Sequence, residues 1–118
     1  MPNLGTTLKN LTILQLAKNE FEKAKKFYKE SSEIYQKLAE VNPQTYLPDL
    51  AMMQITISLY CQENIVDKKL AIQSLDEALI NLLPFSEIPY IQNYLNHVYR
   101  ALEYWGINVE AYLIEKGF

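Results

Sequence analysis

Apolar side chains recur along this chain at steps of three and four residues, which is the spacing of one face of an α-helix. We expect helices over six segments, at approximately 4–17, 20–41, 48–62, 67–83, 86–105 and 108–116. No stretch alternates as a strand would, and only three glycines are present for turns. The pattern therefore predicts an all-α fold.

Proline, glycine and capping residues mark the expected helix ends. Pro43 should end the second helix, because proline disfavours helical geometry in the residue before it, and 42–47 becomes a connector. Pro48 then fits the first turn of the third helix, where its missing N–H costs nothing. The expected N-caps are Asp67, Ser86 and Asn108, and the expected left-handed stops are Gly106 and Gly117. These boundaries predict three antiparallel helical hairpins.

A stripe of small, large and small side chains occurs twice along the chain. The copies are Ala24, Tyr28 and Ser31, then Ala71, Leu75 and Ala78. On a helix this spacing puts all three side chains on one face, where the small residues let a second helix come close. Because another apolar stretch precedes each copy, we expect helix pairs that repeat along the chain. Repeated pairs indicate a stacked scaffold, which usually binds rather than catalyses.

These residues resemble the tetratricopeptide repeat (TPR) family, whose unit contains Trp-x2-Leu-Gly-x2-Tyr, then Ala-x3-Phe, then Pro. The matching positions of the first unit are Leu8-x2-Leu11-Thr12, Ala24-x3-Tyr28 and Pro43. Those of the second are Met53-x2-Thr56-Ile57, Ala71-x3-Leu75 and Pro84, and a degenerate third unit has Leu95, Tyr99 and Trp105. The period of 45 residues from Leu8 to Met53 resembles the elongated, kinesin-light-chain type of repeat. The linker from Asn42 to Ala51 is similar to those of bacterial TPR proteins.

The resemblance implies a right-handed solenoid of helical hairpins in one TPR-like domain over 1–118, with repeats at about 4–43, 46–84 and 86–117. It also implies that the first helix of each hairpin lines a concave groove for a peptide or partner segment. The groove candidates are Lys9, Asn10 and Ile13 in the first unit, Gln54, Ser58 and Gln62 in the second, and Asn93, His97 and Arg100 in the third.

The three candidates of the third unit lie four and three residues apart, so they share one helix face. Arg100 suits a peptide carboxylate or an acidic side chain, because a guanidinium forms bidentate hydrogen bonds. The alternative is that these residues are only the hydrophilic side of an amphipathic helix. The aromatic residues nearby leave a similar choice between a partner surface and packing; they are Tyr90, Tyr94, Tyr99, Tyr104, Trp105 and Tyr112.

Charge and cysteine content narrow the classes of partner. The net charge is −3, with nine Lys/Arg and eight Asp/Glu in 1–69 but two and six in 70–118, which argues against nucleic acid. Glutamates lie on both sides of the lysines of 23–29, as on a solvated helix face; they are Glu20, Glu22, Glu30 and Glu33. Cys61 is the single cysteine, so an internal disulfide is excluded. We interpret its side chain as a small hydrophobic group that is buried or half-buried. A single cysteine is also compatible with a protein of the cytoplasm. No apolar run approaches the ~20 residues that span a bilayer, so we expect no membrane partner.

The function expected from these features is a protein–protein interaction scaffold. The alternative is an assembly module that self-associates, for example as a homodimer, because apolar residues surround much of the first helix. These residues are Leu4, Ile13, Leu14 and Leu16. No paired carboxylates, nucleophile with base, phosphate loop or metal-ligand cluster is present, so we expect neither an enzyme nor a cofactor. A complete chain and a piece of a larger protein both remain open.

Overall fold

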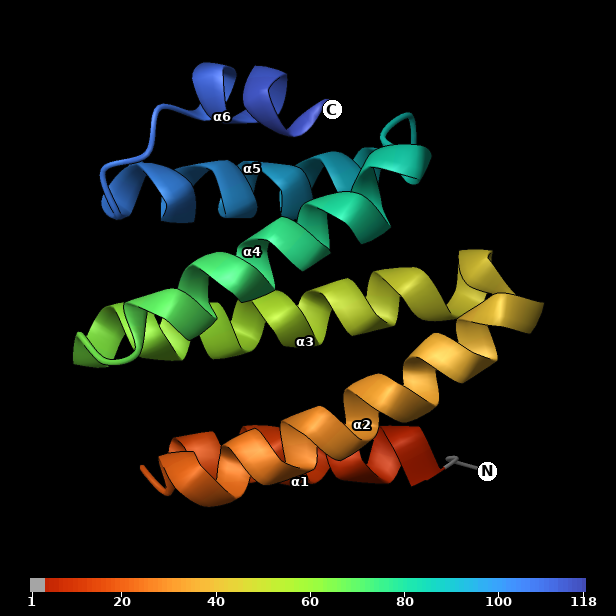
Figure 1. Cartoon of the computed structure of the whole chain (residues 1–118). Coiled ribbons are helices and arrows are strands. Elements are labelled where there is room, and N and C mark those ends of the chain that lie inside the picture. The colour runs from red at the N-terminus through yellow and green to blue at the C-terminus, as the bar shows by residue number, and fades with distance from the viewer. Residues whose placement is uncertain (1–3) are drawn as a thin grey trace.

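The computed structural model describes residues 4–118, and this part of the chain is helical with no strand (Figure 1). The helices are α1 (Leu4–Ala17), α2 (Phe21–Val41), α3 (Pro43–Asn64), α4 (Lys68–Leu82), α5 (Pro89–Tyr104) and α6 (Val109–Lys116), with a 3-10 turn, η1 (Leu83–Phe85), after α4. The prediction of an all-α protein is confirmed.

Most of the expected helix ends are confirmed by their capping contacts. The Asp67 carboxylate accepts a hydrogen bond from the Leu70 amide at 3.1 Å, and the Asn108 side chain accepts one from the Ala111 amide at 2.9 Å. Gly106 has a φ of 81°, the left-handed conformation that a helix stop requires and that glycine adopts without a Cβ penalty. Side-chain caps therefore start α4 and α6.

The start of α3 corrects the expectation of a connector over 42–47. Asn42 is extended (φ −141°), as the residue before a proline should be, but it serves at once as the C-cap of α2 and the N-cap of α3. Its side chain accepts from the Thr45 amide at 3.4 Å, and Pro43 takes the first helical position. Pro48 therefore lies inside the helix and is buried rather than opening it.

The start of α5 also differs from expectation, because Ser86 does not cap it. Ile88 holds the N-cap position with an extended backbone (φ −80°, ψ 126°) and makes no side-chain cap. Pro89 imposes this conformation on the residue before it and fills the first helical position itself. The Ser86 carbonyl instead accepts a hydrogen bond from the side-chain amide of Gln92.

The helices pack most extensively in sequential pairs, α1 with α2 and α3 with α4, and the α2–α3 and α4–α5 contacts join the pairs (Figure 1). Both small-large-small stripes are buried, as predicted. Ser31 shows why a small residue is needed: its hydroxyl donates to the Gly5 carbonyl at 2.9 Å, so the backbone of α1 lies directly against α2.

Helices α3 and α5 run side by side in the same direction. The Tyr94 hydroxyl lies 3.7 Å from the Met52 sulfur, and the Tyr104 hydroxyl lies 3.4 Å from the Gln62 carbonyl oxygen. The two contacts join residues separated by the same 42 positions, which only parallel helices allow. Successive odd-numbered helices are thus neighbours in space as well as members of different pairs.

Candidate functional site

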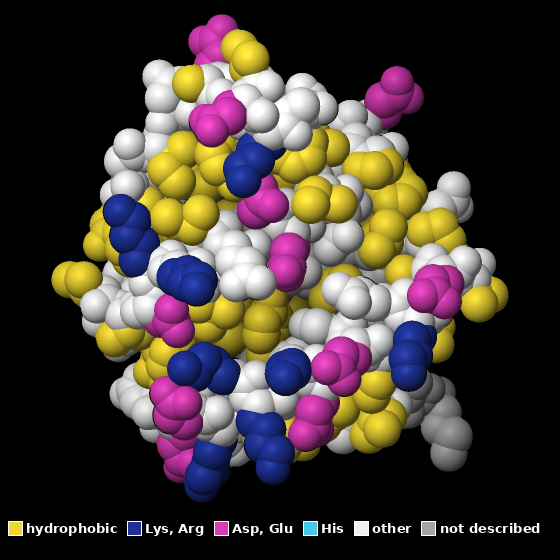
Figure 2. Space-filling model, viewed as in Figure 1, with side chains coloured by type: hydrophobic (Ala, Val, Ile, Leu, Met, Phe, Trp, Pro, Cys, Tyr) yellow, Lys and Arg dark blue, Asp and Glu magenta, His cyan; other side chains and the backbone are white. Residues whose placement is uncertain are grey.

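A groove of about 380 Å³ lies between α2 and α4. This volume falls in the range of ~300–1,000 Å³ that ligand pockets occupy. Figure 2 shows the molecule from the side on which α2 and α4 lie toward the viewer, with hydrophobic side chains in a hollow between charged ones. The groove is lined from α2 by Lys25, Tyr28, Lys29, Ser32, Glu33 and Gln36, and from α4 by Leu70, Gln73, Ser74 and Glu77.

Tyr28 and Ser74 form the floor of the groove, where α2 and α4 approach each other. The tyrosine hydroxyl lies 3.4 Å from the serine hydroxyl, and both residues are buried. Burial, with a smaller contribution from the Glu77 carboxylate, raises the pKa of Tyr28 to about 12. The phenol therefore keeps its proton at neutral pH and offers a neutral hydroxyl at the base of a largely apolar floor.

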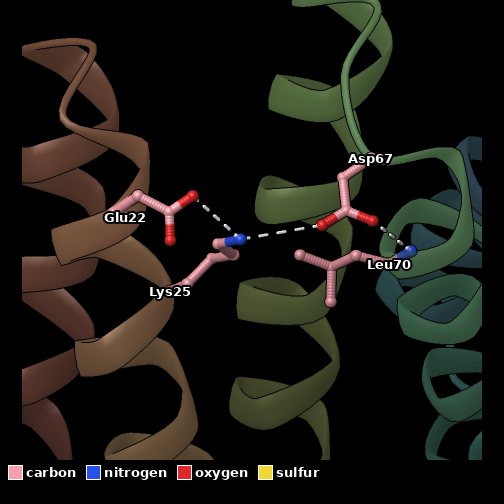
Figure 3. A network of polar contacts seen from close by, with 4 residues as sticks. All are labelled: Glu22, Lys25, Asp67 and Leu70. Atoms are coloured by element: carbon pink, nitrogen blue, oxygen red, sulfur yellow. Dashed lines mark hydrogen bonds and ion pairs between the residues drawn. The ribbon is translucent and has the colours of Figure 1, made fainter.

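Lys25 connects the two helices at one end of the groove (Figure 3). Its ammonium lies 3.1 Å from the Glu22 carboxylate on α2 and 3.8 Å from the Asp67 carboxylate, which also caps α4. The ammonium also lies 4.8 Å from the centre of the Phe21 ring. Two carboxylates thus compensate this charge, and the contact links α2 to the start of α4.

The other charged groups of the groove are compensated less completely. Among the described residues, neither the Lys29 ammonium nor the Glu33 carboxylate has an ion-pair partner within 4.0 Å, although they lie one turn apart on α2. Glu77 on the facing helix accepts a single hydrogen bond, from the Gln54 amide at 3.3 Å. The rim therefore presents charge of both signs to whatever enters the groove.

Gln54 and Ser58, which were expected to line a groove on α3, are buried with 1% and 0% of their surface exposed. Gln54 is held between α3 and α4, where it donates to Glu77 and accepts from the Asn81 amide at 3.1 Å. The expectation that these two side chains face a partner is therefore wrong. A buried amide needs hydrogen-bond partners, and both of them come from α4.

The remaining sequence candidates lie fully or partly at the surface, on three different helices. On α1, Asn10 and Ile13 are exposed and Lys9 is half-buried, whereas on α5 Asn93, His97 and Arg100 are all exposed. Helix α1 packs on α2 and α3, and α5 packs on α3 and α4, so α3 lies between the helices that carry the two sets. Gln62 is half-buried on α3, and its side-chain oxygen has no hydrogen-bond partner among the described residues.

The groove between α2 and α4 was missed by the sequence analysis, for an identifiable reason. Tyr28 belongs to a stripe interpreted as packing, and Lys29 and Glu33 belong to the mixed charges interpreted as a solvated face. The groove lies where these two faces meet, so each residue fits the expectation for its own helix. The usable signal was Ser74, a hydroxyl placed within an apolar stripe of α4 and opposite the hydroxyl of Tyr28.

Other parts of the described chain carry less chemistry. Burial, followed by the Asp67 carboxylate, raises the pKa of the Cys61 thiol to about 11, and the residue is buried as expected.

Residues 4–118 contain no group of three or more His, Cys, Asp or Glu side chains arranged to hold a metal ion. Within the same range, no helix combines the length and the apolar character needed to cross a bilayer. Comparison with protein-family models, curated proteins and solved structures gives no match.

Proposed function

We propose that this protein is an interaction module and that the groove between α2 and α4 holds an extended segment of a partner polypeptide. The observation that carries the proposal is the shape of the groove. Its lining on α2 runs from Lys25 to Gln36, a rise of about 16 Å along the helix axis. That length matches roughly five residues of extended chain. The mixed lining, with an apolar floor and hydrogen-bonding rims, suits a peptide backbone and its side chains.

The scaffold in this proposal is a TPR-like, right-handed solenoid. Its support is the recurrence of like contacts at like offsets along the chain. The pairs Tyr94–Met52 and Lys25–Asp67 each span 42 residues, and the Tyr28–Ser74 pair spans 46. Stacked repeats place equivalent residues beside each other in this way. The proposed groove lies between the second helices of two repeats rather than on the first helices, where the family resemblance had located the partner.

A display selection with random octapeptides tests the proposal. Gln36→Trp fills the groove from an exposed rim position, and Gln44→Trp makes the same change at an exposed position of α3 outside the groove. We expect selected peptides to lose at least tenfold in affinity on Gln36→Trp and to keep their affinity on Gln44→Trp. Failure to enrich any peptide, or equal binding to both variants, would contradict the proposed groove.

A second candidate function, head-to-tail self-association, is favoured by the two ends of the molecule. On α1, Leu4 and Leu14 are 63% and 46% exposed, and at the other end Ile114 and Phe118 are 73% and 44% exposed. Helix α1 carries a lysine and no acidic residue, whereas α6 carries two glutamates and one lysine. The ends are therefore both apolar and of opposite net charge, so one copy can continue the stack of another.

Light scattering after size exclusion separates this function from the first. We expect the mass to rise with protein concentration, and Leu14→Glu to return it to that of a single chain. Ile80→Glu is the matched control, because Ile80 is 52% exposed on α4 and belongs to neither end. A constant single-chain mass at all concentrations would eliminate self-association and would leave the groove proposal untouched.

A further inference from the structure

The charges around the groove between α2 and α4 are segregated along its length. The two helices run in the same direction here, because Lys25 contacts Asp67 and, further along both helices, Tyr28 contacts Ser74. The lysines of the lining therefore lie toward the end where both helices start. Glu33 and Glu77 lie further along α2 and α4. The lysines and the glutamates of the lining are therefore separated along the groove.

Only part of this charge is neutralised within the described residues. Lys25 is held by two carboxylates, so the cation that remains for an occupant is Lys29. Further along the groove, Glu33 has no ion pair and Glu77 has one neutral amide donor. A simple anion would meet two carboxylates in the groove, and a simple cation would meet two lysines. An occupant with both signs of charge satisfies both sets of groups.

The spacing of these charges fits an extended peptide. Lys29 and Glu33 are four residues apart on α2, which is a rise of about 6 Å. In an extended chain, side chains on the same side repeat every two residues, or about 6.6 Å. An acidic and a basic side chain separated by one residue would therefore reach Lys29 and Glu33 together from one side of the bound segment.

We infer that the groove selects a peptide segment in which an acidic and a basic residue flank one central residue. This inference rests on the proposed function and specifies its partner. The acidic side chain contacts Lys29, the basic side chain contacts Glu33 with Glu77 opposite, and the backbone lies above Tyr28. The direction of the bound chain fixes whether the acidic or the basic residue comes first.

Three labelled heptapeptides, identical except at their centres, test the inference by fluorescence anisotropy. Their central residues are Asp-Leu-Lys, Lys-Leu-Asp and the neutral Asn-Leu-Gln. We expect one charged order to bind about fivefold more tightly than the neutral peptide, from two partly exposed ion pairs, and to lose this advantage at high salt. Lys29→Gln and Glu33→Gln should each reduce the advantage. The matched controls Lys26→Gln and Glu30→Gln, exposed on the same helix but outside the groove, should preserve it.

The charge-swapped double variant Lys29→Glu/Glu33→Lys provides the decisive comparison. It should reverse which of the two charged peptides binds more tightly, an outcome that loss of folding cannot produce. Equal binding of all three peptides, or an unchanged preference in the double variant, overturns the charge inference. If those peptides still lose affinity on Gln36→Trp, the groove proposal survives that failure. If Gln36→Trp has no effect on any of them, both proposals fail.

Discussion

Helices α3 and α6 differ in how they are held in the molecule. Helix α3 packs against α1, α2, α4 and α5, and nine of its residues are buried, including Leu50 and Ile57. Helix α6 has no buried residue and lies at the outer end, with α5 beneath it (Figure 1). Its eight residues are also fewer than the ~12–15 that an isolated helix needs in water. The interior of the molecule is therefore stabilised by packing, whereas its last helix depends on its end caps and a few side-chain contacts.

Truncating one leucine in the interior and one in α6 should give the largest difference in the free energy of unfolding. Leu75 on α4 is fully buried, whereas Leu113 on α6 is half-buried. We expect Leu75→Ala to lower the free energy of unfolding by ~2–5 kcal/mol, through lost burial and the cavity that remains. Leu113→Ala should cost less than about 1 kcal/mol. Urea denaturation followed by circular dichroism measures both. Equal losses of unfolding free energy would contradict the comparison, because they would mean that α6 is packed as tightly as the interior.

The second largest effect is expected at alkaline pH, which should lower the free energy of unfolding through the buried phenol of Tyr28. The pKa of Tyr28 is raised to about 12, above its value of about 10 in an unfolded chain. The folded state thus binds the phenolic proton more tightly, so this stability is present below pH ~10 and is lost as the pH rises toward ~12. Between about pH 9 and about pH 11.5, Tyr28→Phe should lose about 2 kcal/mol less than the wild type. Parallel pH profiles of the two proteins would refute this.

The features of this fold that depend on local chemistry could be predicted from the sequence. The caps at Asp67 and Asn108 each act on the amide three residues away, so their spacing alone indicates them. The stripe of Ala24 and Ser31 was predictable for a similar reason, because helical spacing fixes which side chains share a face. At these positions the structure confirms the caps and the buried stripe that the sequence predicts.

The features that depend on neighbouring helices could not be predicted in this way. Gln54 and Ser58 are polar, and their helix alone assigns them to the solvent side. Only the position of α4 shows that they are buried, and it supplies both partners of Gln54. The groove has the same origin, because Lys29 and Ser74, which are 45 residues apart in the sequence, line it together only through the packing of α2 and α4. Geometry between helices depends on how the helices pack rather than on any one segment.

Removing the N-cap of α4 or of α6 sharpens the comparison at a smaller scale. Asp67→Ala should lower the free energy of unfolding by about 1 kcal/mol, because the cap starts a packed helix. Asn108→Ala removes the corresponding hydrogen bond of α6, and we expect it to fray that helix with little effect on global unfolding. Hydrogen exchange distinguishes the two outcomes. Faster exchange confined to 109–116 is expected for Asn108→Ala, and faster exchange throughout the chain would argue against a separately held α6.

The smallest expected effect concerns the contact that attaches α6 to the interior. The Tyr112 hydroxyl donates to the Asp76 carboxylate on α4 at 2.6 Å, a charge-assisted hydrogen bond. Tyr112→Phe keeps the ring on its apolar neighbours but removes this bond, so α6 should exchange its amide hydrogens faster while the urea midpoint changes little. Tyr104→Phe is the matched control, because that tyrosine is half exposed on α5 and bonds to the Gln62 carbonyl instead. If Tyr112→Phe leaves exchange in α6 unchanged, the ring and the end caps alone hold the helix in place.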